Sequence, residues 1–337
     1  MSLTRVAEKA NVSVMTVSRV LNCKDSVSEA TRQKVLAVSR ELGIFPKNRG
    51  RRSAAHAGQA DERRRVAVLV DTDISSFFLS ELLVSLQRSL ANLDFDCLVQ
   101  TFTEEQSDFL RALSRIRPSV AAACLAVGQF SDDQVRGILN ANPLCVFVDF
   151  TPSPMLDQPV NVVSYDNAAA ARMAVAQLAA CACKRILCIQ GISSNHFSRT
   201  MREGYLLALG RSDFEKGCLV TADFTANGGY RAMKAVLDAG TPFDGLFTTD
   251  EMAFGAIRAM KERGLRIPED VKVMGCDGME LGKELTPPLS TVILDRQVLS
   301  ERAVARLLEV INSPQKVMER VLLAPRIEVR GTCIPSD

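Results

Sequence analysis

The pattern of apolar positions begins with a helical segment at the N-terminus. Leu3, Val6, Ala7 and Ala10 share one face at helical spacing, and Ser2 precedes them as an N-cap. One apolar face and one polar face are typical of a short helix in a larger helical unit.

Two more segments complete that unit. Asn11 tolerates the left-handed conformation of a tight turn, and Ser13 is placed to cap a second helix over residues 14–22. Ser28 caps a third helix of about 14 residues, which Gly43 ends. Two short helices, a tight turn and a supporting helix predict a helix-turn-helix unit. An ordinary small helical bundle is the alternative.

Residues 46–65 separate this unit from the rest of the chain and read PKNRGRRSAAHAGQADERRR. Small, polar and basic residues without an apolar pattern predict a flexible tether. We therefore expect a head over residues 1–45, a linker over 46–65 and a large body over 66–337.

The body alternates strand-like and helix-like segments from residue 66 onward. Residues 66–70 (VAVLV) form a continuous apolar run, as in a buried parallel strand, and a helical stretch follows from Phe78 to Leu93. This alternation continues to VKVMGCDG at 271–278 and predicts parallel sheets covered by helices. About ten such units exceed one comfortable sheet. The predicted fold class is α/β, with an all-α head and two doubly wound lobes.

Composition divides the chain in the same way. The protein has 337 residues, 47% of them hydrophobic, which excludes a largely disordered chain. Its net charge of +2 hides a basic head: residues 1–65 hold 14 Lys and Arg against 6 Asp and Glu, a net charge of +8, and the remainder carries −6. This asymmetry favours a module that binds a polyanion. A merely solvated basic face is the alternative.

Cysteines and targeting signals indicate the compartment. None of the ten cysteines forms a C-x-x-C pair, so we expect no metal site and interpret them as free thiols in a reducing cytoplasm. The N-terminus has no apolar signal region, and no apolar run approaches the length that spans a membrane.

The stretch LTRVAEKANVSVMTVSRVLN…VSEATRQKV…ELG resembles the head of the lactose/galactose repressor (LacI/GalR) family of bacterial transcriptional regulators. The resemblance implies that the second helix lies in the major groove of DNA, with Val14, Met15 and Arg19 at base-reading positions. Arg19 suits a bidentate contact to guanine, whereas Val14 and Met15 offer apolar contact, for example to a thymine methyl group. The implied phosphate contacts are Ser13, Thr16, Ser18, Asn22 and Thr31.

The linker departs from that family, whose hinge helix wedges a leucine into the minor groove. Gly50, Arg51, Arg52 and Ser53 stand at those places. Gly50 weakens a helix by about 1 kcal/mol relative to alanine, and Ser53 lacks the apolar side chain of a wedge. We expect Arg51 and Arg52 to enter the minor groove with a reduced kink in the DNA. A tether that contacts only phosphate is the alternative.

Four aspartates end strand-like segments of the body: Asp71, Asp149, Asp250 and Asp277. Ligands of open parallel sheets bind outside the carboxyl ends of the strands. A single such aspartate is more often a helix cap, but four of them favour a polar cleft suited to a hydroxyl-rich ligand.

Several segments of the body also look like the effector domain of the LacI/GalR family, notably SYDNAAAAR, FTTDEMAFGAIRAMKERGLRIPEDVKVMGCDG and LTPPLSTV. The resemblance implies a core like that of the periplasmic binding proteins, whose two lobes close over a small effector. It also implies three crossings between the lobes, the third near Val292–Asp295 with a short return around 320. The implied lobes are about 66–160 with 292–320, and about 161–291 with 321–337.

The same resemblance implies a set of effector contacts. Asp277 in GCDG is the strongest candidate, whereas Asp250 has the alternative role of capping the helix that starts at Glu251. Arg199 and Arg202 both miss the usual spacing of the effector arginine, so either is a candidate. The candidate phenylalanines have the alternative of being plain core. The full set is Phe77, Phe78, Asp149, Arg199, Arg202, Phe224, Thr249, Asp250 and Asp277.

Together these features predict a sequence-specific transcriptional regulator, a repressor, that binds double-stranded DNA as a homodimer at a near-palindromic operator. A small effector, a sugar or sugar acid, controls its affinity. A purine-type or other metabolite, or regulation without an effector, is the alternative. The end of the chain has no heptad repeat for a tetramer.

An enzyme is the alternative from a different class. The sequence has no G-x-x-x-x-G-K-[ST], G-x-S-x-G or H-E-x-x-H motif and only two histidines, although carboxylates can also serve as general acids. We therefore expect no enzymatic activity, no cofactor and no membrane partner, and a cytoplasmic protein associated with the nucleoid.

Overall fold

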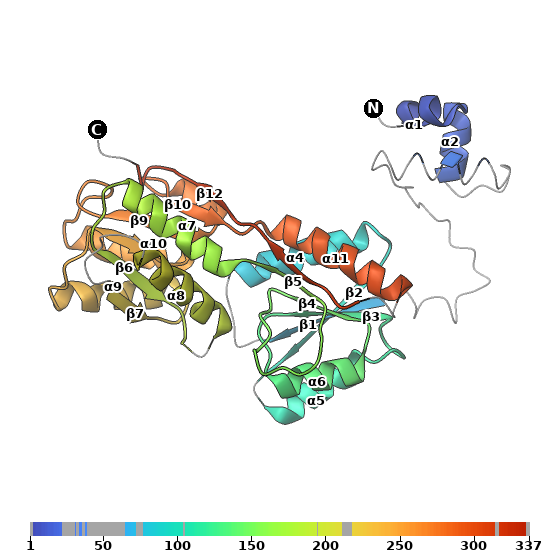
Figure 1. Ribbon diagram of the computed structural model, residues 1–337, viewed down its shortest axis with the longest axis horizontal. Helices are drawn as coiled ribbons and strands as arrows, with labels where there is room; N and C mark the ends of the chain where they lie inside the picture. The colour runs from blue at the N-terminus through green and yellow to red at the C-terminus, as the bar shows by residue number, and fades with distance from the viewer. Residues whose placement is uncertain are drawn as a thin grey trace. The chain divides into compact units, whose positions relative to one another are not determined.

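The computed structural model describes residues 3–21, 31, 34, 35, 38, 65–71, 77–103, 105–193, 195–210, 218–313 and 317–334. The chain divides into two compact units, Met1–Asp61 and Glu62–Asp337 (Figure 1). The boundary falls inside the basic stretch 46–65.

The first unit contains helix α1 (Leu3–Ala10) and helix α2 (Val14–Leu21). Asn11 adopts a φ of 49° in the turn between them. The Ser13 hydroxyl accepts the amide hydrogen of Thr16 at 3.0 Å, as an N-cap does. The two helices and their tight turn are confirmed.

The apolar faces of this unit meet in one small core. The described residues of the predicted third helix are helical, and one of them, Val35, is fully buried in that core. The predicted ends of this helix, Ser28 and Gly43, lie outside the described residues. The core consists of Val6, Ala7, Ala10, Val17, Val20 and Val35.

The second unit contains two six-stranded sheets. The first has the order β11-β5-β4-β3-β1-β2, and all its strand pairs are parallel. Its strands are β1 (Arg65–Asp71), β2 (Asp96–Phe102), β3 (Ala123–Val127), β4 (Cys145–Val148), β5 (Val162–Tyr165) and β11 (Arg320–Leu323).

The second sheet has the order β12-β10-β9-β8-β6-β7, and β12 alone among its described strands runs antiparallel to its neighbour. Its strands are β6 (Ile186–Gln190), β7 (Cys218–Thr221), β8 (Gly245–Phe247), β9 (Lys272–Asp277), β10 (Ser290–Ile293) and β12 (Arg326–Glu328).

Helices cover both faces of each sheet. On the first sheet, α4 (Phe77–Ala91) and α11 (Arg296–Asn312) pack on one face, and α5 (Gln106–Arg115) and α6 (Asp132–Ala141) pack on the other. On the second sheet, the two pairs are α7 (Asn167–Ala180) with α8 (His196–Leu209), and α9 (Ala226–Asp238) with α10 (Asp250–Glu262). A short 3-10 helix, η2 (Glu280–Glu284), follows β9.

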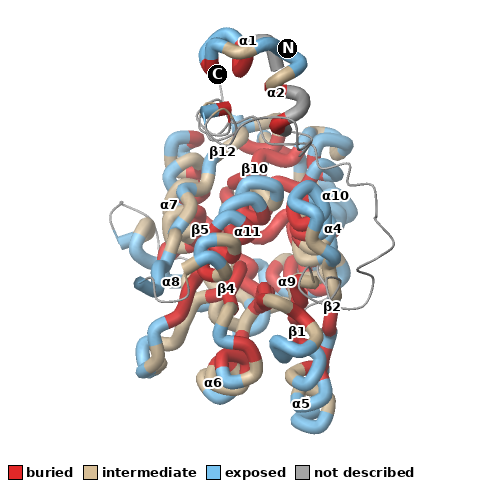
Figure 2. Tube along the Cα trace, turned by 90° about the vertical axis from the view of Figure 1, so that its right-hand side faces the viewer, coloured by how far each residue is buried: buried red, intermediate tan, exposed pale blue. Residues whose placement is uncertain are grey.

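This layering explains the continuous apolar runs of the sequence. Along β1, Val66, Val68 and Val70 enter the core on one face of the sheet, while Ala67 and Leu69 enter the core on the other. A strand between two layers of helices has no polar face. Figure 2 shows the central strands buried and the outer faces of the helices exposed. The α/β fold with two doubly wound lobes is confirmed.

The chain crosses between the two sheets three times: after β5, after β10 and after β11. The first crossing follows Tyr165 instead of lying near 160, because β5 pairs with β4 in the first sheet. The last lies between Leu323 and Arg326, because β11 pairs with β5 and β12 pairs with β10. Three segments of chain therefore connect the lobes.

Helices α9 and α10 touch through their backbones. A Cβ atom added at Gly255 would lie 1.7 Å from the carbonyl oxygen of Ala226. We expect Gly255→Ala to destabilise the protein by about 3 kcal/mol, because two backbones must separate to admit one methyl group. Thermal or urea unfolding measures this change.

The matched control is Gly210→Ala, at the end of α8. The added Cβ would lie at 3.6 Å from its nearest neighbour, in ordinary contact, and the backbone φ is −68°. We expect no loss of stability there. Equal effects of the two substitutions would contradict the close packing of α9 on α10.

Candidate functional site

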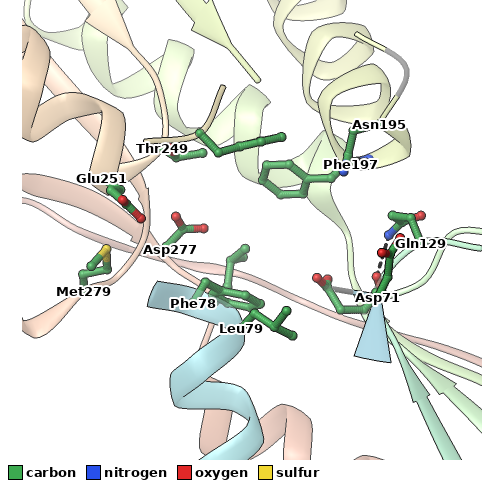
Figure 3. A pocket seen from close by; sticks show the side chains of 14 residues that line it. Asp71, Phe78, Leu79, Gln129, Asn195, Phe197, Thr249, Glu251, Asp277 and Met279 are labelled. Atoms are coloured by element: carbon green, nitrogen blue, oxygen red, sulfur yellow. Dashed lines mark hydrogen bonds between the residues drawn. The ribbon is translucent and has the colours of Figure 1, made fainter. Parts of the chain in front are cut away.

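A cavity lies between the two lobes, at the carboxyl ends of their strands (Figure 3). The empty space inside its lining is about 750 Å³, a figure that includes space open to solvent. Both lobes contribute side chains from the segments that follow their strands. The lining residues are Asp71, Phe78, Leu79, Gly128, Gln129, Asp149, Asn195, Phe197, Phe224, Thr249, Glu251, Asp277, Met279 and Leu294.

The structure brings together five of the nine residues that the sequence suggested for the effector. Phe78, Asp149, Phe224, Thr249 and Asp277 line the cavity. The other four do not line it and lie elsewhere: Phe77, Arg199, Arg202 and Asp250.

Asp149 and Asp277 reach the cavity from opposite lobes, each at the end of a strand. Their φ angles are 53° and 128°, which are costly for residues other than glycine. Desolvation raises the pKa of Asp149 to about 7. Desolvation, with repulsion from Asp250, raises the pKa of Asp277 well above its usual value. Strained backbone and perturbed carboxyl groups that meet in a cavity are typical of a functional site.

We expect Asp149→Asn to raise the melting temperature of the unliganded protein more at about pH 8 than at about pH 5. A carboxyl group with a folded pKa near 7 is protonated at the lower pH but must carry its charge in the cavity at the higher one. Because the folded state disfavours the ionised form, the wild-type protein loses stability as the pH rises from the ordinary aspartate pKa toward 7. Asparagine stays neutral at both pH values. The gain in the free energy of unfolding from the substitution should therefore be larger at about pH 8 than at about pH 5, by roughly 1–3 kcal/mol.

The control for this experiment is Asp133→Asn, because the side chain of Asp133 is 94% exposed. It should have the same small effect at both pH values. An effect of Asp149→Asn that does not depend on pH would contradict the raised pKa.

Asp250 supports the cavity instead of lining it. It is fully buried, and its carboxylate accepts hydrogen bonds from the Met279 amide at 2.7 Å and the Thr291 hydroxyl at 2.6 Å. Burial raises its pKa to about 6. The N-cap position of α10 belongs to Thr249, so Asp250 does not cap that helix either. Its hydrogen bonds hold the turn that follows Asp277.

Phe77 and the two candidate arginines are exposed. Phe77 is 58% exposed, and its amide approaches the Glu251 carboxylate at 3.5 Å. Arg199 and Arg202 lie on the exposed side of α8. Phe197 on the same helix lines the cavity, and a helix turns by 100° per residue, so positions two and five residues later point elsewhere.

Aromatic side chains form the wall where an arginine was expected. Asn195 caps α8 by accepting the Phe197 amide hydrogen at 2.8 Å. This cap holds Phe197 so that its ring centroid lies 6.0 Å from that of Phe224. Phe224 itself has a φ of 67° at the turn before α9. The candidate phenylalanines Phe78 and Phe224 thus face the cavity, where Phe197 joins them.

Arg296 connects the loop of Asp277 in the second lobe with α4 in the first. Its guanidinium donates hydrogen bonds to the carbonyl oxygens of Asp277 and Gly278. It also pairs with Glu81 at 2.6 Å and lies over the Phe78 ring at 5.6 Å from the centroid. A ligand that moves Asp277 is therefore expected to move the start of α4.

Sequence reasoning missed Gln129, Asn195, Phe197 and Glu251. All four follow strands of the two sheets by a few residues, so the rule that led to the aspartates could have found them. Asp71 was noted at the end of its strand and does line the cavity.

The described part of the chain also bears on membrane insertion and metal binding. None of its helices combines the length and the apolar character needed to cross a membrane. In the same ranges, no cluster of His, Cys, Asp and Glu side chains is arranged to hold a metal ion.

The first unit presents the candidate DNA-reading side chains of α2. Met15 is 64% exposed and Val14 is 44% exposed, so neither belongs to the core of this unit. Ser13 is exposed and Thr16 is half-buried beside it, with their hydroxyls 2.9 Å apart. Thr31 is half-buried. Ser18 and Arg19 belong to α2, but their side chains lie outside the described residues, as do Asn22, Arg51 and Arg52.

Comparisons with family models match both units. Residues 2–47 match the model of bacterial regulatory proteins of the lacI family. Residues 175–333 match the model of a periplasmic binding protein-like domain.

Curated relatives match over nearly the whole chain. The HTH-type transcriptional repressor CytR of Escherichia coli (strain K12) is 30% identical over 332 residues, covering 97% of this chain and 94% of the relative. The ribose operon repressor of the same organism is 28% identical, covering 97% and 98%.

Two solved structures share the fold and the domain order. The Lac repressor bound to ONPG in its repressed state superposes with a TM-score of 0.75 at 25% identity, covering 98% of this chain and 99% of that one. The complex of the transcriptional regulator CelR with cellobiose has a TM-score of 0.72 at 25% identity, with the same coverage.

Proposed function

The chain belongs to the lacI family of bacterial regulatory proteins, and we propose that it represses transcription as a homodimer whose affinity for operator DNA is set by a small molecule in the interlobe cavity. One observation carries the proposal: a cavity lined by carboxylates and aromatic rings opens between two lobes joined by three crossings, in a chain that also has a helix-turn-helix unit. Its relatives are transcriptional repressors, and an enzymatic function is therefore rejected.

The proposed domains follow this division of labour. Residues 1–45 form the DNA-binding head, 46–65 the linker and 66–337 the effector-binding and dimerisation domain. Effector binding closes the lobes and changes the spacing of the two linkers in the dimer. This requires only that the effector binds the two states with different affinity. We place the regulator in the cytoplasm, on the nucleoid.

Base reading is assigned to the exposed start of α2. Val14 and Met15 offer apolar surface to a thymine methyl group, and Arg19 offers its guanidinium fork to guanine O6 and N7. Arg51 and Arg52 are proposed to enter the minor groove electrostatically. Phosphate contacts are assigned to Ser13, Thr16, Ser18, Asn22 and Thr31.

Arg19→Ala is expected to weaken operator binding by about 1–3 kcal/mol and to relax one base preference. A lost bidentate contact removes discrimination at a single base pair, whereas a lost phosphate contact weakens all sequences alike. Fluorescence anisotropy with operator and random DNA measures the two losses. Equal losses on both would refute the reading role.

Effector recognition is assigned to Phe78, Asp149, Phe224, Thr249 and Asp277, which line the cavity. A sugar-sized molecule is proposed because the cavity combines aromatic surface with carboxylates, and because the similar regulator CelR was solved with cellobiose. Polar groups fixed in such a cavity discriminate strongly between hydroxylated ligands.

Selection of bound sequences from a random DNA pool tests the regulatory function. We expect an enriched site with two-fold symmetry, because a symmetric dimer presents two equal heads. A pool without an enriched motif would contradict sequence-specific regulation.

A further inference from the structure

The charge of the cavity lining is one-sided. Asp71, Asp149, Glu251 and Asp277 all contribute carboxylates, while no lysine or arginine of the described ranges lines the cavity. Figure 3 shows Glu251 and Asp277 on the side of the second lobe and Asp71 on the side of the first. A ligand between the lobes would therefore meet acidic groups from both.

Two of these carboxylates have no protein donor. Within the described structure, the carboxylate oxygens of Asp149 and Asp277 accept no hydrogen bond. Arg296 is the arginine that bears on Asp277, but it donates to backbone carbonyl oxygens and to Glu81. Buried carboxylates are ordinarily paired or hydrogen-bonded. The missing partner is supplied by whatever occupies the cavity.

Two neutral groups of the lining also lack partners. Thr249 is 5% exposed, yet its hydroxyl has no hydrogen-bond partner and does not cap α10. Gln129 donates its amide group to the carbonyl oxygen of Asp149 at 2.6 Å, which leaves its own side-chain oxygen buried without a donor. An unsatisfied buried polar group costs about 1–3 kcal/mol. The Gln129 oxygen can only accept a hydrogen bond, and the Thr249 hydroxyl can accept one as well as donate one.

The rest of the wall is aromatic or aliphatic. Phe78, Phe197 and Phe224 surround the acidic groups, together with Met279 and Leu294. The faces of aromatic rings attract cations, most strongly in a site that excludes water. Such a surface also packs against the carbon skeleton of a ligand.

We propose that the effector carries a protonated amine on a sugar-sized body, as an amino sugar does. This inference rests on the proposed function and narrows its ligand class. An ammonium group donates three hydrogen bonds and accepts none, so it fits an acceptor-rich wall. A hydroxyl group donates only one hydrogen bond and carries no charge, and a sugar acid would add negative charge next to the ionised form of these carboxyl groups.

The test is a thermal-shift and calorimetric screen of the full-length protein with matched ligand sets. Each set holds an amine, its neutral alcohol and its carboxylate on one skeleton: hexosamines with hexoses and uronates, and hydroxylated alkyl and aryl amines with their counterparts. We expect at least one amine to bind. Its alcohol counterpart should bind at least tenfold more weakly, and its carboxylate counterpart should not bind. If a neutral or anionic member of a set binds most tightly, or if no amine binds, the inference is overturned.

Variants tie the result to the cavity. Asp277→Asn should weaken the amine at least tenfold while changing any residual binding of the neutral counterpart little, and Thr249→Val should weaken both. Asp133→Asn, far out in solvent, should change neither. An amine that binds Asp277→Asn and the wild type equally also overturns the inference.

The outcomes separate this inference from the proposed function. If a neutral sugar binds and shifts operator affinity, the regulatory function stands and the amine is wrong. If an amine binds through Asp277 without any change in operator affinity, the ligand class stands and effector control is wrong.

Discussion

Asp277→Ala is expected to abolish the response to the effector while leaving operator binding intact. The carboxylate stands at the end of β9 in the cavity and is 8% exposed. It accepts no hydrogen bond from the described protein, so it is free to accept one from a ligand in the cavity. Loss of a buried charge-assisted contact costs about 2–5 kcal/mol, which weakens effector binding by about 30-fold or more.

Operator binding should survive because the head forms a separate unit with its own core. Calorimetry measures effector affinity, and a gel-shift titration measures operator affinity. Asp277→Asn keeps the shape of the side chain and serves if the alanine variant is unstable, and Asp133→Ala is the surface control. Unchanged effector affinity in both Asp277 variants would remove this residue from the site.

Operator affinity is expected to fall about 10³-fold or more between about 50 and 200 mM salt. Residues 1–65 carry a net charge of +8 and the remainder carries −6, so a dimer offers two basic heads and an acidic body to the DNA. Each phosphate that the heads neutralise releases condensed counterions, and six or more such contacts give a loss of this size.

The slope of log K against log salt measures the number of these contacts. The same titration with the body alone, residues 62–337, should show no DNA binding at any salt concentration, because its net charge is negative. A flat salt profile of the full-length protein would contradict the basic head as the binding module.

The sequence predicted the elements of the fold well because burial leaves simple patterns. The run VAVLV became β1, with both of its faces in a core. Asp149 and Asp277 were recognisable as site residues because the carboxyl end of a parallel strand is where ligands bind. These inferences need only local periodicity and the direction of a strand.

The details of the site depend on geometry that the pattern does not contain. Arg199 and Arg202 had suitable chemistry, but the start of α8 at His196 turns Phe197 to the cavity and leaves both arginines exposed. Asp250 also follows a strand, as a lining residue would. It is fully buried behind the cavity instead, where its carboxylate accepts a hydrogen bond from Thr291. Helix phase and partners distant in sequence decided these cases.

The central claim is that a ligand in the interlobe cavity controls the affinity for DNA. The most direct measurement is the dissociation constant for the selected operator, with and without a saturating ligand found by the screen, in the wild type and in Asp277→Asn. We predict a change of about fivefold or more in the wild type, as expected for coupled sites, and none in the variant. An operator affinity that stays constant while the wild-type cavity is saturated would contradict the account.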